Sequence, residues 1–201
     1  MPKVSDEYRS ARRREIADAA VRQILQHGVH GTTLAHITEE SGLSAGAIYT
    51  HFESKDDIIA YVASSAIETV LSDLDSVVDT SPLPPPIVLL ERITGSIPKT
   101  TDARLIVQLW GEAVTNASVR SIANGVFDRA REALREYLML WLVHSKGHSI
   151  VAARNGAQPA ARTIVSLIYA YILQSSLLDN FDRDAYLDDV RVAESWLSDS
   201  R

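Results

Sequence analysis

The chain has 201 residues, of which 46% are hydrophobic and 23% charged, a balance typical of a globular protein with a sizeable core. It contains no cysteine, which excludes disulfides, thiolate nucleophiles and cysteine-bound zinc, and which is compatible with a reducing cytosol. No run of roughly 18 apolar residues predicts a membrane span, and the start lacks the apolar stretch of a signal peptide. We therefore expect a cytoplasmic protein with no membrane partner, no metal and no cofactor.

The formal net charge is −6, which would disfavour binding to nucleic acid if the charge were spread evenly. The charge is uneven, because residues 1–14 hold five basic side chains against two acidic ones. A basic arm on an acidic body is typical of a protein that touches DNA with one end only. The basic side chains of the arm are Lys3, Arg9, Arg12, Arg13 and Arg14.

Apolar residues recur at spacings of three and four along nearly the whole chain, which predicts an all-α fold of about nine helices. Gly28 and Gly42 are expected to end the first two helices, and Ser44 to cap the third. The proline-rich segment 80–86 predicts a hinge, and 147–158 with its Asn-Gly pair predicts a loop. In chain order the predicted helices are 8–27, 33–41, 45–52, 54–79, 86–96, 102–117, 119–146, 159–178 and 182–198.

Two short predicted helices flank the turn Gly42-Leu43-Ser44. Ile48 and Phe52 lie four residues apart, so both can face the core and hold the second of these helices in place. Its start and outer face are then left exposed, and helix-turn-helix proteins place that end in the major groove of DNA. We therefore predict a three-helix DNA-binding domain at 1–58, followed by a helical ligand-binding and dimerisation domain at 59–201.

The segment from Gly28 to Lys55, GVHGTTLAHITEESGLSAGAIYTHFESK, resembles the tetracycline-repressor (TetR) family. The resemblance covers residues 10–62, and the remainder matches only in length and helicity. The positions that carry it are Gly28, Thr32, Thr33, Ile37, Ser41 to Ser44, Gly46, Tyr49, His51, Phe52 and Lys55.

The resemblance implies a role for each residue around the turn. Thr33 is expected to bind a phosphate through its hydroxyl and backbone amide. Lys55, at the start of the fourth helix, is expected to bind another with help from the helix dipole. Tyr49 and His51 would reach phosphates beside the groove, and the basic arm with Arg12 and Arg13 would lie near the neighbouring backbone or minor groove. The residues expected to face the groove itself are Ser44, Ala45, Gly46, Ala47 and Thr50.

Residues 44–52 contain no Arg, Asn or Gln, so bidentate reading of bases from this helix is not expected. Methyl contacts, water or DNA shape would have to supply specificity. Each residue also has a structural alternative: Tyr49 as a packing residue, His51 and Lys55 as solvated side chains, and the arginines as an ordinary exposed turn.

Apolar residues at spacings of three and four in the last two predicted helices exceed what one subunit needs. They predict a four-helix interface in a two-fold homodimer, which suits an operator with half-sites ~34–36 Å apart. Packing within the monomer is the alternative. The expected interface residues are Ile164, Val165, Ile168, Ile172, Val190 and Leu197.

Aromatic side chains interleaved with polar ones between residues 102 and 146 predict a pocket for a small apolar or aromatic effector, or a cationic one if Glu112 is buried. An ordinary core is the alternative. Effector binding would move the fourth helix and release the DNA. The resemblance implies that the chain represses transcription, and activation is the alternative. The expected pocket residues are Trp110, Glu112, Asn116, Tyr137 and Trp141.

Two other classes of function remain open from the residues alone. An enzyme would need Ser/His/Asp or paired carboxylates, and His144 with His148 offers too few ligands for zinc. A helical protein-binding module leaves the helix-turn-helix unexplained. We therefore expect a ligand-responsive regulator that binds double-stranded operator DNA and is not an enzyme.

Overall fold

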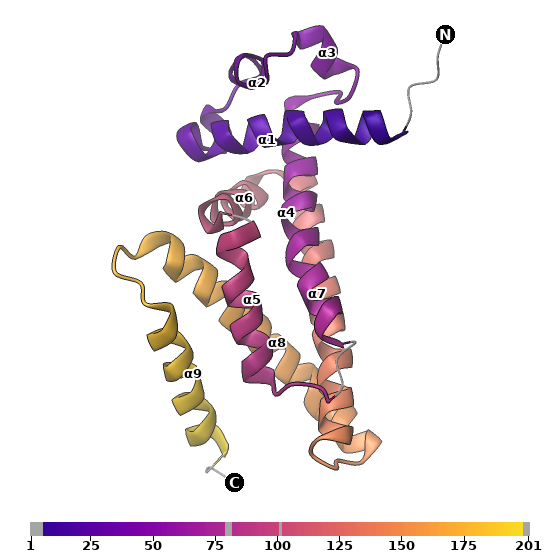
Figure 1. Cartoon of the computed structure of the whole chain (residues 1–201), viewed down its shortest axis with the longest axis vertical. Helices are drawn as coiled ribbons and strands as arrows, with labels where there is room; N and C mark the ends of the chain where they lie inside the picture. The colour runs from indigo at the N-terminus through magenta and orange to yellow at the C-terminus, as the bar shows by residue number, and fades with distance from the viewer. Residues whose placement is uncertain (1–5, 79–81, 101, 199–201) are drawn as a thin grey trace. The chain divides into compact units, whose positions relative to one another are not determined.

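The computed structural model describes residues 6–78, 82–100 and 102–198, except for the side chains of 67–78, 98–100 and 193–198. Within these ranges it contains nine helices and no strand, which confirms the all-α prediction (Figure 1). None of the described helices is both long and apolar enough to cross a bilayer. The helices are α1 (Asp6–Gly31), α2 (Leu34–Ser41), α3 (Ala45–Tyr49), α4 (Lys55–Val78), α5 (Pro86–Thr100), α6 (Ala103–Thr115), α7 (Ala117–His144), α8 (Ile150–Leu177) and α9 (Arg183–Ser198).

The helices form two compact units, each described by itself below. The division differs from the predicted one at residue 58, because Leu105, Leu109 and Val119 belong to the core of the first unit. The first unit comprises Met1–Ile67 and Leu105–Gly125, and the second comprises Glu68–Arg104 and Val126–Arg201.

The first unit is built on α1, with α2 and α3 packed over one side of it (Figure 1). Ile16, Ala20 and Ile24 recur every four residues on α1 and are completely buried. Ile48 and Phe52 are also buried, and they join the same core. Each such side chain stabilises the fold by about 1.5–3 kcal/mol, which is enough to fix a helix as short as α3.

Glycines shape both turns of the helix-turn-helix. Gly28 leaves helical geometry with φ 74°, and one further turn, Val29–Gly31, continues α1 beyond the predicted end. Gly42 closes α2 in the predicted left-handed conformation, with φ 67°. The third helix ends at Tyr49, three residues before the predicted end, and the Thr50 hydroxyl there donates to the carbonyl of Ala47 at 2.6 Å.

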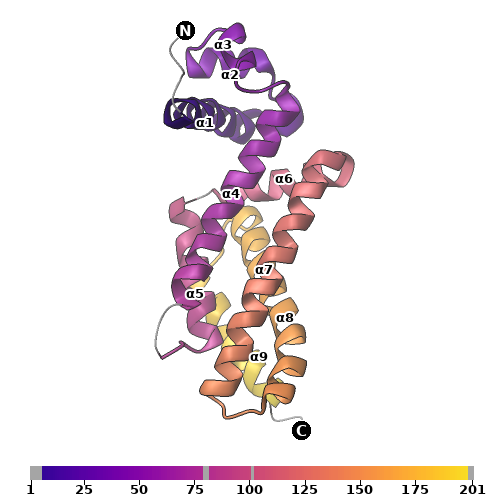
Figure 2. The same cartoon turned by 90° about the vertical axis from the view of Figure 1, so that its right-hand side faces the viewer.

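In the second unit α5, α8 and α9 pack against one another (Figure 2). Leu89, Ile93 and Ile97 of α5 are almost fully buried. Tyr137 of α7 is buried, and its hydroxyl donates to the carbonyl of Pro84, just before α5. That bond joins α7 to the proline-rich segment predicted as a hinge.

The prediction of a loop at 147–158 is wrong, because α8 already begins at Ile150 and Pro159 lies inside it. The Ser149 hydroxyl accepts from the backbone N–H of Ala152 at 3.3 Å and caps the helix. Ala153 and Ala157, one turn apart, are fully buried. Their packing stabilises the helix against the roughly 3 kcal/mol that an interior proline costs.

Candidate nucleic-acid interface

Arg13 of α1 is bound to the chain's own fold. Its Nη1 donates to the carbonyl of His51 at 2.7 Å. Its guanidinium lies over two rings, 4.2 Å from the centroid of Phe52 and 4.7 Å from that of Tyr61. This side chain therefore holds the end of the helix-turn-helix, and its DNA contact stays a prediction. The sequence pattern around Arg13 could not predict this structural role, because its acceptor, His51, lies 38 residues further along the chain.

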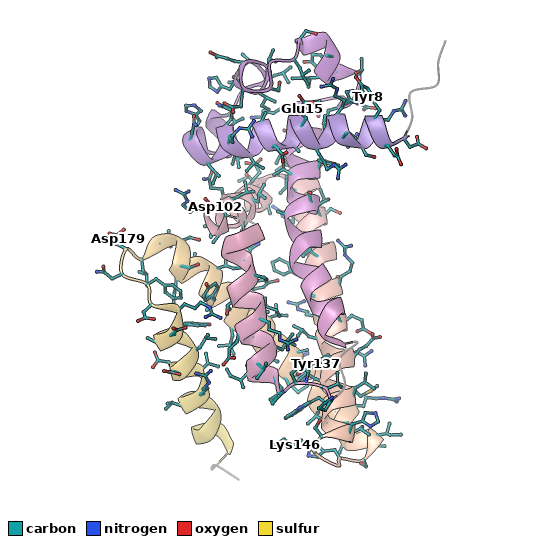
Figure 3. The ribbon with its side chains drawn as sticks, viewed as in Figure 1. Tyr8, Glu15, Asp102, Tyr137, Lys146 and Asp179 are labelled. Carbon is teal, nitrogen blue, oxygen red and sulfur yellow. The ribbon has the colours of Figure 1, made fainter. Side chains whose placement is uncertain are left out.

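Arg12 lies between Tyr8 and Glu15 on α1, both labelled in Figure 3. Its Nε donates to the Tyr8 hydroxyl at 3.1 Å, and its Nη1 pairs with the Glu15 carboxylate at 2.5 Å. The hydrogen bond to Tyr8, and then that to Glu15, raise the pKa of the Arg12 guanidinium above its ordinary value. This pair is half-exposed, so Arg12 stays a proposed DNA contact.

The start of α2 carries a reciprocal cap. Thr33 Oγ1 accepts from the backbone N–H of His36 at 3.2 Å, and His36 Nδ1 accepts from the backbone N–H of Thr33 at 3.4 Å. This is a capping box with an imidazole where Glu or Gln is usual. Thr33 is exposed and keeps its hydroxyl hydrogen, but the backbone N–H expected to bind phosphate is engaged by His36.

The exposed face of α3 agrees with the predicted one. Ser44 accepts from the backbone N–H of Ala47 at 3.2 Å and caps the helix, while Ile48 points inward and is fully buried. Tyr49 is 57% exposed, which excludes the alternative of a packing residue. Of the other residues expected to face DNA on this helix, Ser44, Ala45, Gly46 and Thr50 are exposed, and Ala47 and His51 are half-buried.

Lys55 starts α4 and is half-buried. Its Nζ donates to the carbonyl of Thr32 at 3.0 Å and lies 3.4 Å from that of Val29. The side chain therefore ties α4 to the end of α1, directly before Thr33. An ammonium has three donors, so one remains for the phosphate contact that we still propose.

A clamp between α1 and α2 was not expected from the sequence. Arg22 forms an ion pair with Glu40, and the other oxygen of Glu40 accepts from the Gln23 amide at 3.0 Å. The Arg22 hydrogen bond holds the pKa of the Glu40 carboxyl below its ordinary value. The clamp fixes α2 on α1, so α3 rests on a rigid support.

The five residues expected to bind an effector are divided between the two units. Trp110, Glu112 and Asn116 belong to the first unit, and Tyr137 and Trp141 belong to the second. Burial raises the pKa of the Tyr137 phenol well above its ordinary value, so the group remains a hydrogen-bond donor.

Glu112 is 7% exposed and takes part in the packing of the first unit. Its Oε1 accepts from the Asn116 amide at 3.1 Å, and its Oε2 lies 3.4 Å from His30 Nε2. Its carboxylate and Asn116 are thus engaged with the chain itself.

A small apolar pocket in the first unit includes only Trp110 of the expected effector-binding residues. Its space of about 290 Å³ includes space open to solvent, and the enclosed part has room for about one water molecule. Its lining residues are Ala63, Ala66, Ile106, Leu109, Trp110, Val119 and Ala123.

The expected dimer residues of α8 face the chain's own core. Ile164, Val165, Ile168 and Ile172 are each at most 8% exposed, so the predicted interface is corrected at these four positions. Val190 of α9 is half-buried, and the side chain of Leu197 lies outside the described residues. The exposed apolar side chains on the last turns of α8 and just beyond are instead Leu173, Leu177 and Leu178.

Known proteins resemble the chain in two ways. Residues 16–62 match the model for bacterial regulatory proteins of the tetR family. The repressor Rv1474c of Mycobacterium tuberculosis, named as an HTH-type transcriptional repressor, is 38% identical over 68 residues, which are 34% of this chain and 36% of that protein. The chain spans between about a third and about a half of the length of the first curated relatives that it matches.

Solved structures show the same fold over most of the chain. A TetR transcription regulator from Haloarcula marismortui has a TM-score of 0.75 at 19% identity, over 95% of this chain and 98% of that one. A regulator from Saccharomonospora viridis, determined in complex with choline, has a TM-score of 0.67 at 20% identity, over 90% and 94%. The family match and the shared fold together lead to one conclusion: residues 16–62 are similar to the DNA-binding part of bacterial regulatory proteins of the tetR family, and the whole chain has the fold of such regulators.

Proposed function

We propose that the chain is a transcriptional regulator that binds double-stranded operator DNA through α2 and α3 and acts as a repressor. The observation that carries this proposal is the exposed face of α3. Ile48 and Phe52 fix that helix on the core, so Ser44, Ala45 and Gly46 remain available to the major groove.

Thr33 before α2, Lys55 at the start of α4 and Tyr49 at the end of α3 would bind the flanking phosphates. Since α3 offers no bidentate base-reading side chain, affinity would come mainly from phosphates and specificity from DNA shape, methyl contacts and water. The binding would therefore weaken steeply with salt.

A gel shift with the promoter region of the chain's own gene tests this function. Ala45→Glu places a carboxylate on the exposed start of α3 and should weaken specific binding by about tenfold or more, because it repels the backbone phosphates. Ala152→Glu is the matched control, since Ala152 is an exposed alanine in the first turn of α8. A missing salt-sensitive, specific shift with the unmodified chain would exclude the proposed function. A reporter gene behind the same promoter distinguishes repression from activation.

We also propose a homodimer, with the second copy covering the exposed apolar side chains at the end of α8. Leu173 and Leu177 are one turn apart and are 43% and 64% exposed, and Leu178 follows directly. Leu177→Asp should convert the dimer to a monomer in light scattering. Val151→Asp, at the other end of α8, is the control because Val151 is 70% exposed. A dimer that survives Leu177→Asp would refute this face.

The effector we propose is a small apolar or aromatic molecule that binds next to Trp110. The other side chains that line the pocket are those of alanine, leucine, isoleucine and valine, and such a lining favours an apolar ligand. The choline in the Saccharomonospora viridis regulator adds small organic cations to the candidates. The ligand would act by binding the DNA-free state more tightly. A thermal-shift screen in which no such molecule raises the Tm or releases DNA would contradict this proposal.

A further inference from the structure

Two histidines lie together at the start of α2, beside the proposed phosphate contact of Thr33. The ring of His27, near the end of α1, is 4.9 Å from the ring of His36 between centroids, with the planes tilted by 33°. His27 is exposed and His36 is half-buried, so protons and phosphates can reach the pair from solvent.

The capping box fixes the neutral form of His36. Because its Nδ1 accepts from the backbone N–H of Thr33, the lone pair is on Nδ1 and the hydrogen is on Nε2. A protonated ring carries hydrogen on both nitrogens, so its Nδ1 cannot accept this bond. Protonation therefore releases the Thr33 N–H and places a positive charge beside it.

A DNA phosphate changes the balance between these two forms. In the free chain, protonation costs the cap, and a second positive charge on His27 would repel the first. With a phosphate at the start of α2, the released Thr33 N–H and the imidazolium both gain an anionic acceptor, and the helix dipole adds to the attraction. The protonated form is then the better binder.

We propose that His36, together with the neighbouring His27, couples proton uptake to phosphate binding at the start of α2, so that DNA affinity rises as the pH falls below 8. This rests on the proposed DNA-binding function. Imidazole is the side chain that changes charge in this range.

Other charges around the pair do not compete for this role. Glu40, one turn after His36, is held by Arg22 and Gln23, and His30 lies against Glu112. The remaining titratable or charged groups on α2, on α3, on the last three turns of α1 and on the first turn of α4 are Glu39, Tyr49, Lys55, Asp56 and Asp57. Lys55 is bonded to backbone carbonyls, and the other four are exposed.

The test uses His36→Gln, because glutamine keeps the acceptor of a capping box but does not titrate. Fluorescence anisotropy measures binding of the full chain to two duplexes at constant salt between pH 6 and 8: the promoter region of its own gene, and an unrelated duplex of equal length. Phosphate contacts are independent of sequence, so both duplexes report them.

The unmodified chain should bind both duplexes about fivefold more tightly at pH 6 than at pH 8, because a proton taken up at the start of α2 adds a charge-assisted hydrogen bond to phosphate. His36→Gln should lose most of this gain, and His27→Gln should lose part of it, with unfolding temperatures close to that of the unmodified chain. The double variant His144→Gln/His148→Gln, whose two exposed histidines lie in the second unit, should keep it.

A gain that persists in His36→Gln but disappears in His51→Gln would overturn the inference, since His51 would then be the titrating group. Affinity that does not depend on pH, with specific binding to the promoter duplex, would overturn the inference while the proposed function stands. Absence of binding to either duplex at every pH would overturn both.

Discussion

Arg13→Ala is the change that best separates a structural role from a DNA contact. The substitution removes a hydrogen bond from a charged donor to the carbonyl of His51, worth about 1.5–3 kcal/mol. It also removes the contacts with the rings of Phe52 and Tyr61, worth about 0.5–2 kcal/mol together. The unfolding free energy should therefore fall by about 2–5 kcal/mol.

For a chain of this size, such a loss corresponds to a fall in Tm of roughly 4–20 °C, which differential scanning calorimetry measures directly. Arg13→Lys keeps the charge but loses the planar group that stacks on the rings, so it should recover only part of the stability. Arg12→Ala is the control, because its exposed pair with Glu15 should contribute little to stability.

The salt dependence of DNA binding gives the second readout. Removing a phosphate contact lowers the slope of log K against log salt by about 1, whereas removing a supporting side chain leaves the slope unchanged. We expect weaker binding by Arg13→Ala with an unchanged slope. Unchanged stability combined with a reduced slope would refute the assignment of Arg13 to the fold.

Three further changes test the support of α3. Ile48→Ala should lower the unfolding free energy by about 2–5 kcal/mol in urea denaturation, because it leaves a cavity under the helix; a loss below 1 kcal/mol would contradict full burial. Gly42→Ala should cost about 1–2 kcal/mol in the same assay, from the left-handed backbone alone, because an added Cβ would meet nothing within 4 Å. Glu40→Gln tests the clamp through pH. Arg22 holds the pKa of Glu40 below its ordinary value in the folded chain. The ionised Glu40 therefore stabilises the fold fully at pH values above the pKa that Glu40 has in the unfolded chain. This stabilisation is lost as the pH falls through the lower pKa that Glu40 has in the folded chain. Thermal unfolding between pH 3 and 7 should show the native and variant curves converging at the acid end, and a constant difference would argue against the ion pair.

The helix-turn-helix could be predicted from the sequence because its signals are local. Gly42 and Ser44 act on their immediate neighbours, and the structure confirms both. The start of α8 could not be predicted in this way. Locally, Pro159 and the Asn-Gly pair favour a loop and outweigh the cap at Ser149, and the packing of Ala153 and Ala157 overrides them.

Periodicity also has a limit at the proposed interfaces. It places Ile164 and Ile168 on one apolar face of α8, but it cannot distinguish a face buried in the monomer from one that meets a second copy. For Arg13, a cluster of basic residues predicts a DNA-binding arm, whereas the acceptor that decides its role comes from the other end of the helix-turn-helix.

The first unit is built from two separate stretches of the chain, which affects folding during synthesis and the design of hybrid proteins. Its core includes Leu105, Leu109 and Val119, which leave the ribosome after α4 has left it. The N-terminal 67 residues therefore wait with unfilled apolar surface until about residue 125 has left the exit tunnel, a period in which chaperones can bind them. By the same reasoning, a hybrid regulator that borrows only the first 67 residues would inherit an unfinished core, so the exchange should carry Leu105–Gly125 with it.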